Sequence, residues 1–263
     1  AGKGRSKEFV HEATDSGALV IDNSSAFRMD PDVPLVVPEI NKEMIFKHNG
    51  IIANPNCSTI QMVVALNPLH KIAKIDRVIV STYQATSGAG TKGMQELINQ
   101  THAWVNRKPL EVQNFPTQIA FNLFPHVDIF LENGYTREEM KMVNETKKIM
   151  NTPEMKISAT CVRVPVLRAH SEAVWIETEN KLSAKDARNI LKNSSGIVVK
   201  DEPVDGGYPT PWEADETVDT FVGRIREDLS HPNGLTFWVV ADQLFKGAAL
   251  NSLQIAEILI SSK

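Results

Sequence analysis

Short apolar runs alternate with amphipathic stretches through the first 105 residues. The runs that predict buried strands cover 18–22, 35–39, 51–53 and 77–83. Helical patterns are expected between and after them, at 8–16, 60–69 and 94–105. Strands that alternate with helices are typical of an α/β layer, so the first part of the chain predicts this architecture.

The pattern changes after residue 105. Residues 106–127 contain three prolines and predict a long loop, which together with Trp104 and Phe115 is expected to serve an interface or a function. Thr136 and Glu139 form a capping-box pattern at the start of a later helix. The second half is predicted to be α+β with a mostly antiparallel sheet. Its expected strands are 158–166, 173–178, 221–226 and 235–240, and its expected helices are 135–150, 182–193 and 242–260.

The composition is that of an ordinary globular protein. The 263 residues are 42% hydrophobic and 23% charged, enough for one large domain or two modest ones. A formal net charge of −4 argues against a general nucleic-acid binder, and no apolar run reaches the roughly 18 residues of a membrane span. Two cysteines cannot build a disulfide framework and favour a reducing compartment. We expect a cytoplasmic protein without nucleic-acid or membrane partners.

Cys57 carries the strongest chemical signal in the chain. It follows a predicted strand and begins a predicted helix within Asn-Pro-Asn-Cys-Ser-Thr, residues 54–59. The free N–H groups and positive partial charge of a helix N-terminus favour a thiolate over a thiol. The alternative is a buried structural cysteine, which is common, but a polar elbow argues against it. Cys161 lies in an alternating strand and is expected in the core.

A thiolate nucleophile needs a proton-transfer partner, which is usually histidine. Of the seven histidines, His170 lies between two predicted strands in a polar turn, Arg-Ala-His-Ser-Glu. Arg163 stands seven residues earlier in an otherwise apolar strand, where its charge is costly unless an anion pairs with it. That anion is a carboxylate either of the protein or of a substrate, and the sequence leaves both open.

Two further patterns carry less information. Residues 88–93 match G-x-G-x-x-G, but no second strand ending in an acid follows, so we reject them as the main pyrophosphate loop of a dinucleotide site. A glycine-rich loop that lets the backbone approach a ligand stays open. Charges recur at helical spacing at Glu138, Lys141, Glu145 and Lys148. Spacing alone indicates a solvated face with ion pairs rather than a site.

Five segments together resemble the aspartate-β-semialdehyde dehydrogenase family. They are Val-Ile-Asp-Asn-Ser-Ser-Ala-Phe-Arg at 20–28, Asn-Pro-Asn-Cys-Ser-Thr at 54–59, Tyr-Gln-Ala-Thr-Ser-Gly-Ala-Gly at 83–90, Cys-Val-Arg-Val-Pro at 161–165 and Arg-Ala-His-Ser-Glu at 168–172. They come in the family's order and spacing and span essentially the whole chain.

The resemblance implies a fold of class α/β plus α+β, like that of glyceraldehyde-3-phosphate dehydrogenase. A partial Rossmann-type, dinucleotide-binding domain is followed by an α+β domain for catalysis and dimerisation. The first would occupy residues 1–56, with the closing helix 242–263 packing back on it, and the second residues 57–241.

The resemblance also implies a catalytic set. Cys57 is expected to form an acyl-enzyme, and His170 to act as its acid/base. Asn56 belongs to the same elbow, and Gln84 would orient the acyl group. No metal is expected.

The remaining implied roles concern substrate and cofactor. Arg163 would hold the α-carboxylate of the substrate and Glu138 its ammonium group, which overturns the solvated-face interpretation for Glu138. Arg28 and Lys141 would hold the phosphate. The next Glu–Lys pair on the helix repeats the spacing, so which pair contacts substrate stays open. The implied cofactor contacts are Ser87, Gly88 and Gln243.

The implied activity is the NADPH-dependent reductive dephosphorylation of L-aspartyl-4-phosphate to L-aspartate semialdehyde through a cysteine thioester. It serves lysine, threonine and methionine biosynthesis, with NADP as cofactor and a homodimer or homotetramer as the assembly. The family opens with a strand, a phosphate loop and a helix that this sequence lacks, and the sequence has no initiator methionine. We therefore expect a fragment that is inactive on its own.

Three alternatives were weighed against this activity. An N-acetyl-glutamyl-phosphate reductase would not need the Glu138 carboxylate, because an acetylated amine carries no charge. A non-catalytic dimerisation module would not need to keep Cys57, Gln84, Arg163 and His170 together. A thiol hydrolase that uses the same cysteine and histidine gives no reason for two separate clusters of cations.

Overall fold

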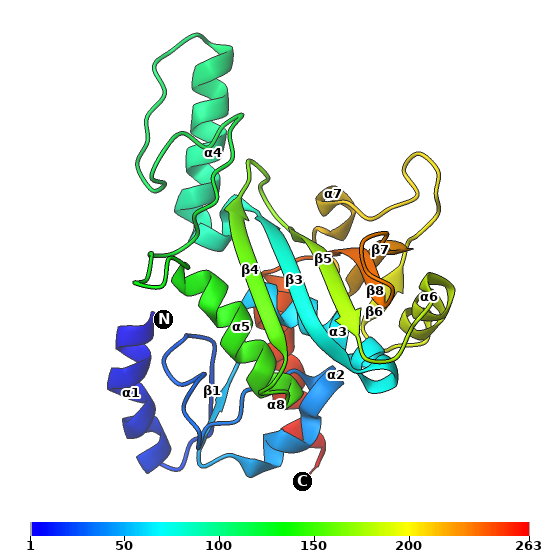
Figure 1. Ribbon diagram of the computed structural model, residues 1–263. Coiled ribbons are helices and arrows are strands. Elements are labelled where there is room, and N and C mark those ends of the chain that lie inside the picture. The colour runs from blue at the N-terminus through cyan, green and yellow to red at the C-terminus, as the bar shows by residue number, and fades with distance from the viewer. Residues whose placement is uncertain (1, 263) are drawn as a thin grey trace.

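A six-stranded mixed sheet forms the centre of the structure, a computed structural model that describes residues 2–262 (Figure 1). Its strand order is β4-β3-β5-β8-β7-β6. The strands are β3 (Ile75–Gln84), β4 (Lys156–Arg163), β5 (His170–Thr178), β6 (Ile197–Val199), β7 (Thr220–Glu227) and β8 (Gly234–Ala241). The three central pairings are antiparallel, as expected, whereas the edge strands β4 and β6 pair in parallel. The short strand β6 was not predicted.

Three helices pack on one face of this sheet. They are α3 (Cys57–Ala73), α5 (Arg137–Met150) and α6 (Ala184–Lys192). Helix α3 contacts β3, β5, β7 and β8, and its side chains are buried on nearly every side. A helix that is apolar all round belongs at the centre of a core, which is where α3 lies. Helix α5 begins with the predicted capping box, in which the Thr136 hydroxyl accepts from the Glu139 N–H and the Glu139 carboxylate accepts from the Thr136 N–H.

A smaller parallel sheet of two strands lies beside the large one. It consists of β1 (Val20–Asp22) and β2 (Ile51–Ala53), with α1 (Lys3–Asp15), α2 (Pro38–Asn41) and the 3₁₀ helix η1 (Lys42–Lys47) around it. The predicted strand at 35–39 is wrong. Only Leu35 makes a bridge, to Ala53, and Pro38 then begins α2 at a position where its missing N–H costs nothing.

The closing segment differs from the single helix expected over 242–260. A π-helical turn, η3 (Phe245–Ala249), comes first, and α8 (Leu250–Ser261) follows it. The turn contacts α3, and α8 contacts β1, α2 and η1. The expected domain division at residues 56 and 57 stays a prediction.

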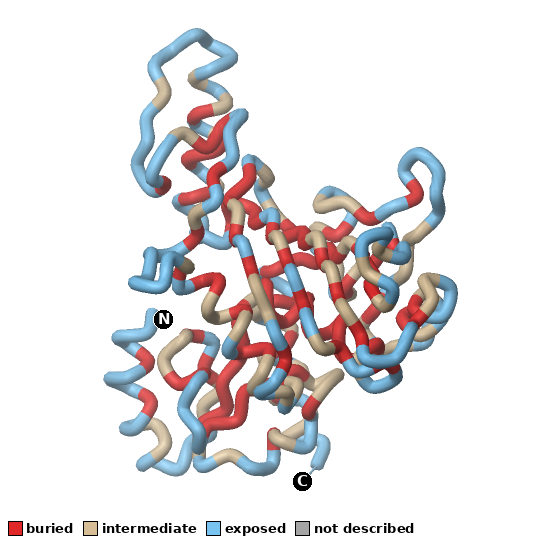
Figure 2. The backbone as a smooth tube through the Cα atoms, in the orientation of Figure 1, coloured by how far each residue is buried: buried red, intermediate tan, exposed pale blue. Residues whose placement is uncertain are grey.

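Helix α4 (Gly90–Val105) and the loop after it project from the sheet (Figure 1). The short 3₁₀ helix η2 (Thr86–Ala89) leads into it, and α7 (Pro211–Ala214) lies in another loop. Gln100 on α4 accepts hydrogen bonds from the Ile119 and Ala120 N–H groups at 2.9 and 3.0 Å, which orders the loop without regular structure. Phe115, predicted at an interface, is instead buried in a small cluster of its own, visible as the buried stretch within the projection in Figure 2.

Candidate active site

Cys57 is the first residue of α3 and follows β2 through a three-residue elbow. Asn56 caps the helix, because its side-chain oxygen accepts the Thr59 N–H at 3.2 Å. The π-helical turn η3 approaches from the other side. A Cβ added to Gly247 would lie only 2.8 Å from the Cβ of Cys57, so this position requires glycine. Sequence reasoning missed Gly247, which a π-helical turn brings to the thiol.

The Glu138 carboxylate joins the first turn of α3 to β3 and α5. Its Oε1 accepts from the Asn56 side-chain amide at 2.9 Å and from Gln84 at 3.2 Å, and its Oε2 lies 2.9 Å from the Lys141 Nζ. Lys141 also pairs with Asp128 at 2.9 Å, a contact that no sequence signal indicated. Glu138 acts on the cysteine, Lys141 pairs with it, and the solvated-face interpretation is wrong for this pair.

The second Glu–Lys pair on α5, Glu145 and Lys148, contacts a loop near residue 28. Glu145 accepts the Asn56 backbone N–H at 2.6 Å and pairs with the Arg28 guanidinium at 3.1 Å. Lys148 donates to the backbone carbonyls of residues 28, 30 and 33. Both residues hold the 28–33 loop against α5. Arg28, expected as a free phosphate ligand, is thus buried beside a carboxylate, although its Nε has no hydrogen-bond partner among residues 2–262.

His170 and Arg163 meet at the backbone of Ala85. The Ala85 N–H donates to Nδ1 of His170 at 3.0 Å, and Arg163 donates to the Ala85 carbonyl at 2.6 Å. A Cβ on Gly88 would lie 2.9 Å from Nη1 of Arg163 and 3.2 Å from Nε2 of His170, so the bare backbone of this loop lies directly against both. The expected polar turn is wrong for His170, which is the first residue of β5 and is fully buried.

Arg163 has no carboxylate within ion-pair distance among residues 2–262, although it is almost fully buried. Its guanidinium carbon lies 5.8 Å from the centre of the Phe115 ring. The sequence left open whether Arg163 pairs with a carboxylate of the protein or of a substrate. The described residues contain no such protein carboxylate. A buried cation in this state is suited to an anion from outside the chain.

Gln243 bridges the two loops beside His170. Its side-chain oxygen accepts the Ala169 N–H at 2.9 Å, and its nitrogen bonds to the Ser87 hydroxyl. Ala169 has a φ of 65°, a left-handed conformation that is unfavourable for alanine and that this bond helps to hold. Ser87, Gly88 and Gln243, the three expected cofactor contacts, are thus neighbours.

The thiol and the imidazole are both neutral in this structure. Burial and the Glu138 charge raise the pKa of Cys57 to about 11, against the lowering effects of Arg28, the Ser58 N–H and Arg163. The expectation that the helix N-terminus produces a thiolate is wrong for this state, because desolvation outweighs the helix. Burial and Arg163 hold the pKa of His170 well below its ordinary value. Since Nδ1 accepts a hydrogen bond, the proton of the neutral ring lies on Nε2.

Nε2 of His170 is buried and has no hydrogen-bond partner among residues 2–262. It is therefore a free donor that lies beside Gly88. Within the same residues, no cluster of three or more histidine, cysteine, aspartate or glutamate side chains could hold a metal ion. None of the helices in the described part of the chain is long and apolar enough to cross a membrane.

The mixed fold, with Cys57 at a helix N-terminus, a buried histidine and a glycine-rich loop, is that of the semialdehyde dehydrogenases. The family model described as "Semialdehyde dehydrogenase, dimerisation domain" matches residues 66–246, and "Semialdehyde dehydrogenase, NAD binding domain" matches residues 1–48. The fold implied by the resemblance is therefore confirmed.

Individual relatives show to which semialdehyde dehydrogenases this chain is similar. Aspartate-semialdehyde dehydrogenase of Aquifex aeolicus is 56% identical over 99% of this chain and 77% of its own length. The Bacillus subtilis enzyme is 52% identical over 98% of this chain and 77% of its length. The crystal structure of aspartate semialdehyde dehydrogenase II from Vibrio cholerae matches with a TM-score of 0.97 at 47% identity, covering 99% of this chain and 78% of that one. The chain belongs to the aspartate-semialdehyde dehydrogenase family, whose enzymes act in amino-acid biosynthesis.

The influence of Glu138 on the thiol is testable. Because its negative charge raises the pKa of Cys57, replacing Glu138 by Gln should lower that pKa below about 11 and increase the thiolate fraction at every pH beneath it. The rate of alkylation of Cys57 against pH, followed by intact mass, measures this pKa. Glu154→Gln, at an exposed position just after the same helix, is the control. An unchanged or higher pKa in Glu138→Gln would contradict the electrostatic coupling.

Proposed function

We propose that this protein reduces L-aspartyl-4-phosphate to L-aspartate semialdehyde with NADPH through a thioester on Cys57, in the synthesis of lysine, threonine and methionine. The observation that supports it is the group of charges around the thiol. Arg163 is a buried cation that forms no ion pair among residues 2–262, and the Glu138 carboxylate lies close enough to raise the pKa of the thiol. One Vibrio cholerae neighbour was solved in complex with ASA, and a Candida albicans neighbour, with a TM-score of 0.76 at 28% identity, was solved with NADP.

The polar groups suit the three charged ends of this substrate. Arg163 would bind the α-carboxylate, because its planar fork matches two carboxylate oxygens. Glu138 would bind the ammonium group, with Asn56 and Gln84 keeping its carboxylate in place. Lys141 and the free Nε of Arg28 would bind the phosphate. An N-acetylated substrate would leave Glu138 without its cation.

Substrate binding would activate the cysteine. The ammonium group offsets the Glu138 charge that raises the pKa of Cys57, so the thiol can give up its proton to the phosphate group of the bound substrate. The thiolate then forms a bond to the acyl carbon, and phosphate leaves with the electrons of the C–O bond. Nε2–H of His170 donates a hydrogen bond to the acyl oxygen as negative charge develops there. This gives His170 the role of a donor rather than of the base that removes the thiol proton.

The loop of Ser87 and Gly88 fits the nicotinamide end of a dinucleotide. Gly88 presents backbone without a side chain beside His170, and Gln243 holds the loop through Ser87. When bound, the nicotinamide dinucleotide would supply the hydride that reduces the thioester. Gln84 and His170 would keep the acyl group turned toward that loop. Collapse of the reduced intermediate releases the aldehyde and returns Cys57 as a thiolate, which takes a proton from solvent to restore the resting thiol.

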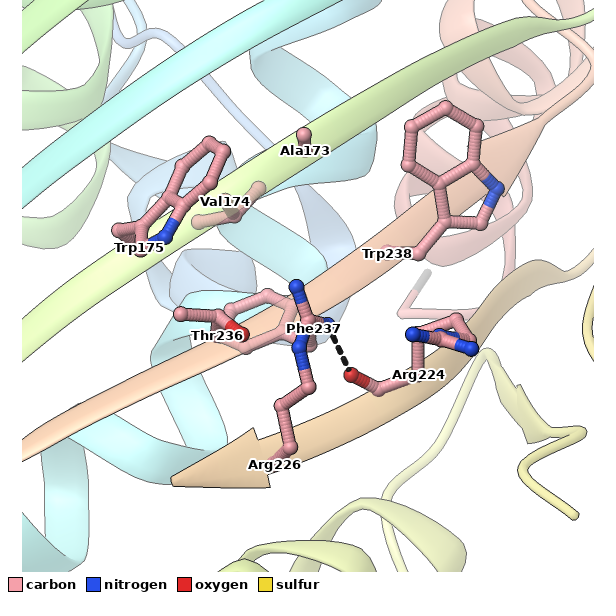
Figure 3. A pocket seen from close by; sticks show the side chains of 8 residues that line it. All are labelled: Ala173, Val174, Trp175, Arg224, Arg226, Thr236, Phe237 and Trp238. Atoms are coloured by element: carbon pink, nitrogen blue, oxygen red, sulfur yellow. Dashed lines mark hydrogen bonds between the residues drawn. The ribbon is translucent and has the colours of Figure 1, made fainter. Parts of the chain in front are cut away.

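The open face of the large sheet would form the interface of a homodimer. On β3 the side chains alternate, and the outward ones include Ile79 and Tyr83, which are 37% and 36% exposed. Figure 3 shows a hollow on this face between Trp175 and Trp238, with Arg224 and Arg226 from β7 along its edge. Tryptophan, tyrosine and arginine on one continuous face are typical of protein–protein interfaces. The matching dimerisation-domain model supports this assignment.

The thioester is tested by removing the sulfur. Turnover is measured on the chain joined to the N-terminal segment that its relatives carry. In that protein Cys57→Ala should have no measurable turnover of aspartate semialdehyde, phosphate and NADP, read as NADPH absorbance, because alanine has no nucleophile to form the acyl-enzyme. The matched control is Cys161→Ala in the buried core, which should retain activity. Appreciable turnover by Cys57→Ala would sink the proposed mechanism.

The carboxylate site is tested by a change of shape without a change of charge. Arg163→Lys replaces a bidentate fork by a point charge, so KM for aspartate semialdehyde should rise about tenfold or more, equivalent to at least about 1.4 kcal/mol. The smaller change is expected in kcat. Arg5→Lys, on the exposed surface of α1, should leave both constants unchanged. An unaltered KM in Arg163→Lys would refute the role.

The interface is tested by a charge on the open face. Ile79→Asp should halve the mass measured by sedimentation, because it places an unpaired carboxylate in an apolar interface. Ile72→Asp, at an exposed position on α3, should leave the mass at that of the dimer. A dimer that survives Ile79→Asp with its circular dichroism unchanged argues for another face.

A further inference from the structure

Glu172 is a fully buried carboxyl group that the proposed chemistry does not use. It lies on β5 two residues after His170, so both side chains project from the same face of the sheet, toward α3. Neither of its oxygens has a hydrogen bond of normal geometry among residues 2–262. An ionised carboxylate in such a place is very unfavourable unless a cation or several donors surround it.

The neighbours of Glu172 supply no cation. Its cross-strand partners are Thr82 on β3 and Val239 on β8. The nearby titratable groups are His170 on its own strand and the Cys161 thiol on β4, and α3 contributes the neutral amide of Gln61. Burial raises the pKa of Glu172 well above its usual value, and hydrogen bonding from Gln61 offsets only part of that rise. No arginine or lysine has an influence on it.

Gln61 on α3 is the neighbour of Glu172 whose side-chain oxygen lacks a hydrogen-bond donor among residues 2–262. It lies four residues after Cys57, one turn further along the same face of α3. Its side-chain nitrogen donates to the backbone carbonyl of His170 at 3.4 Å, a long bond. Its side-chain oxygen is buried and has no donor among residues 2–262. The Gln61 amide thus connects α3, which begins at Cys57, to β5, which begins at His170. Its oxygen still lacks a hydrogen-bond donor among residues 2–262.

Counting donors and acceptors decides which form of Glu172 fits. A carboxylate offers acceptors only and cannot satisfy the Gln61 oxygen. A carboxylic acid carries one O–H donor, and the Gln61 amide is close enough to act on Glu172. The neutral acid therefore gives the Gln61 oxygen its missing partner and avoids a buried, unpaired charge.

We propose that Glu172 is a positioning residue that works as a neutral carboxylic acid: it donates a hydrogen bond to the Gln61 side-chain oxygen and so ties the first turns of α3 to the start of β5. Cys57 is the first residue of the helix that this hydrogen bond holds, and His170 is the first residue of the strand. The positioning role rests on the proposed function, since it matters for catalysis only if these two residues are catalytic. The protonation state does not depend on that function.

The proposal is tested with Glu172→Gln and Glu172→Ala. Glutamine keeps the shape and a donor, so kcat, KM and the pH profile should stay within about twofold of the parent protein. Alanine removes the tie, so kcat should fall by about ten- to a hundredfold through misplacement of the thiol, with KM nearly unchanged. Glu179→Gln, at an exposed position just after β5, is the control and should change neither constant.

Infrared spectroscopy reads the protonation state without any turnover. The protein at neutral pH should show a protonated carboxylic-acid band that is absent from Glu172→Gln and present in Glu179→Gln. The rate of alkylation of Cys57 is a further readout that needs no substrate, and it should change in Glu172→Ala but not in Glu172→Gln. These measurements still decide the proposal if the alanine variant does not fold, because Glu172→Gln and the band suffice.

Two results would overturn the proposal. One is the absence of the carboxylic-acid band at neutral pH. The other is a loss of activity and a shifted pH profile in Glu172→Gln as large as in the alanine variant, which would mean that a charge is required. Failure of the proposed function would look different: Cys57→Ala would remain active while the carboxylic-acid band stayed in place.

Discussion

The buried carboxylate of Glu138 is the interaction on which the arrangement of the site depends. It accepts hydrogen bonds from Asn56 at the start of α3 and Gln84 at the end of β3, and it pairs with Lys141 on its own helix. A carboxylate is stable in a buried place only when donors and a cation surround it. The helix of the cysteine, a strand of the large sheet and α5 are therefore constrained to meet at this point, and the position of the thiol follows.

The same carboxylate sets the charge state of the site. Its pKa is lowered by Lys141 and by the two amides, against the effect of burial, so it stays ionised. The thiol beside it stays protonated, the imidazole of His170 stays neutral, and Arg163 keeps a positive charge without a partner anion. The resting site thus holds separated positive and negative charges. Under the proposed function, the arrival of the substrate completes both ion pairs and lets the thiol ionise.

The period of two along the strands assigns the two faces of the large sheet to different tasks. On β3, Thr82 and Gln84 point inward to the helices, whereas Ile79 and Tyr83 point outward. On β5, His170 and Glu172 point inward and Trp175 outward. A register shift of one residue would exchange the two sets, because successive side chains of a strand project to opposite faces. The proposed catalytic groups and the proposed dimer interface are therefore specified together by the same pairing of strands.

The sequence by itself determined what depends on local order along the chain. Cys57 at the start of a helix, the capping box of α5, the mixed character of the fold and the family all follow from short motifs and their spacing. Local patterning failed at 35–39, where only Leu35 forms a bridge and Pro38 begins a helix, and at the last helix, which a π-helical turn precedes. In both places the backbone follows contacts with other parts of the chain.

Only the tertiary structure decided which charges meet and which groups are ionised. Arg28 pairs with Glu145 across 117 residues, and Asn56 meets Glu138 across 82, distances along the chain that no periodicity encodes. These pairings made Glu138, rather than Glu145, the carboxylate that raises the pKa of the thiol. The protonation of Cys57 was predicted with the wrong sign, because a helix N-terminus can be read from sequence whereas desolvation depends on everything that packs around the sulfur.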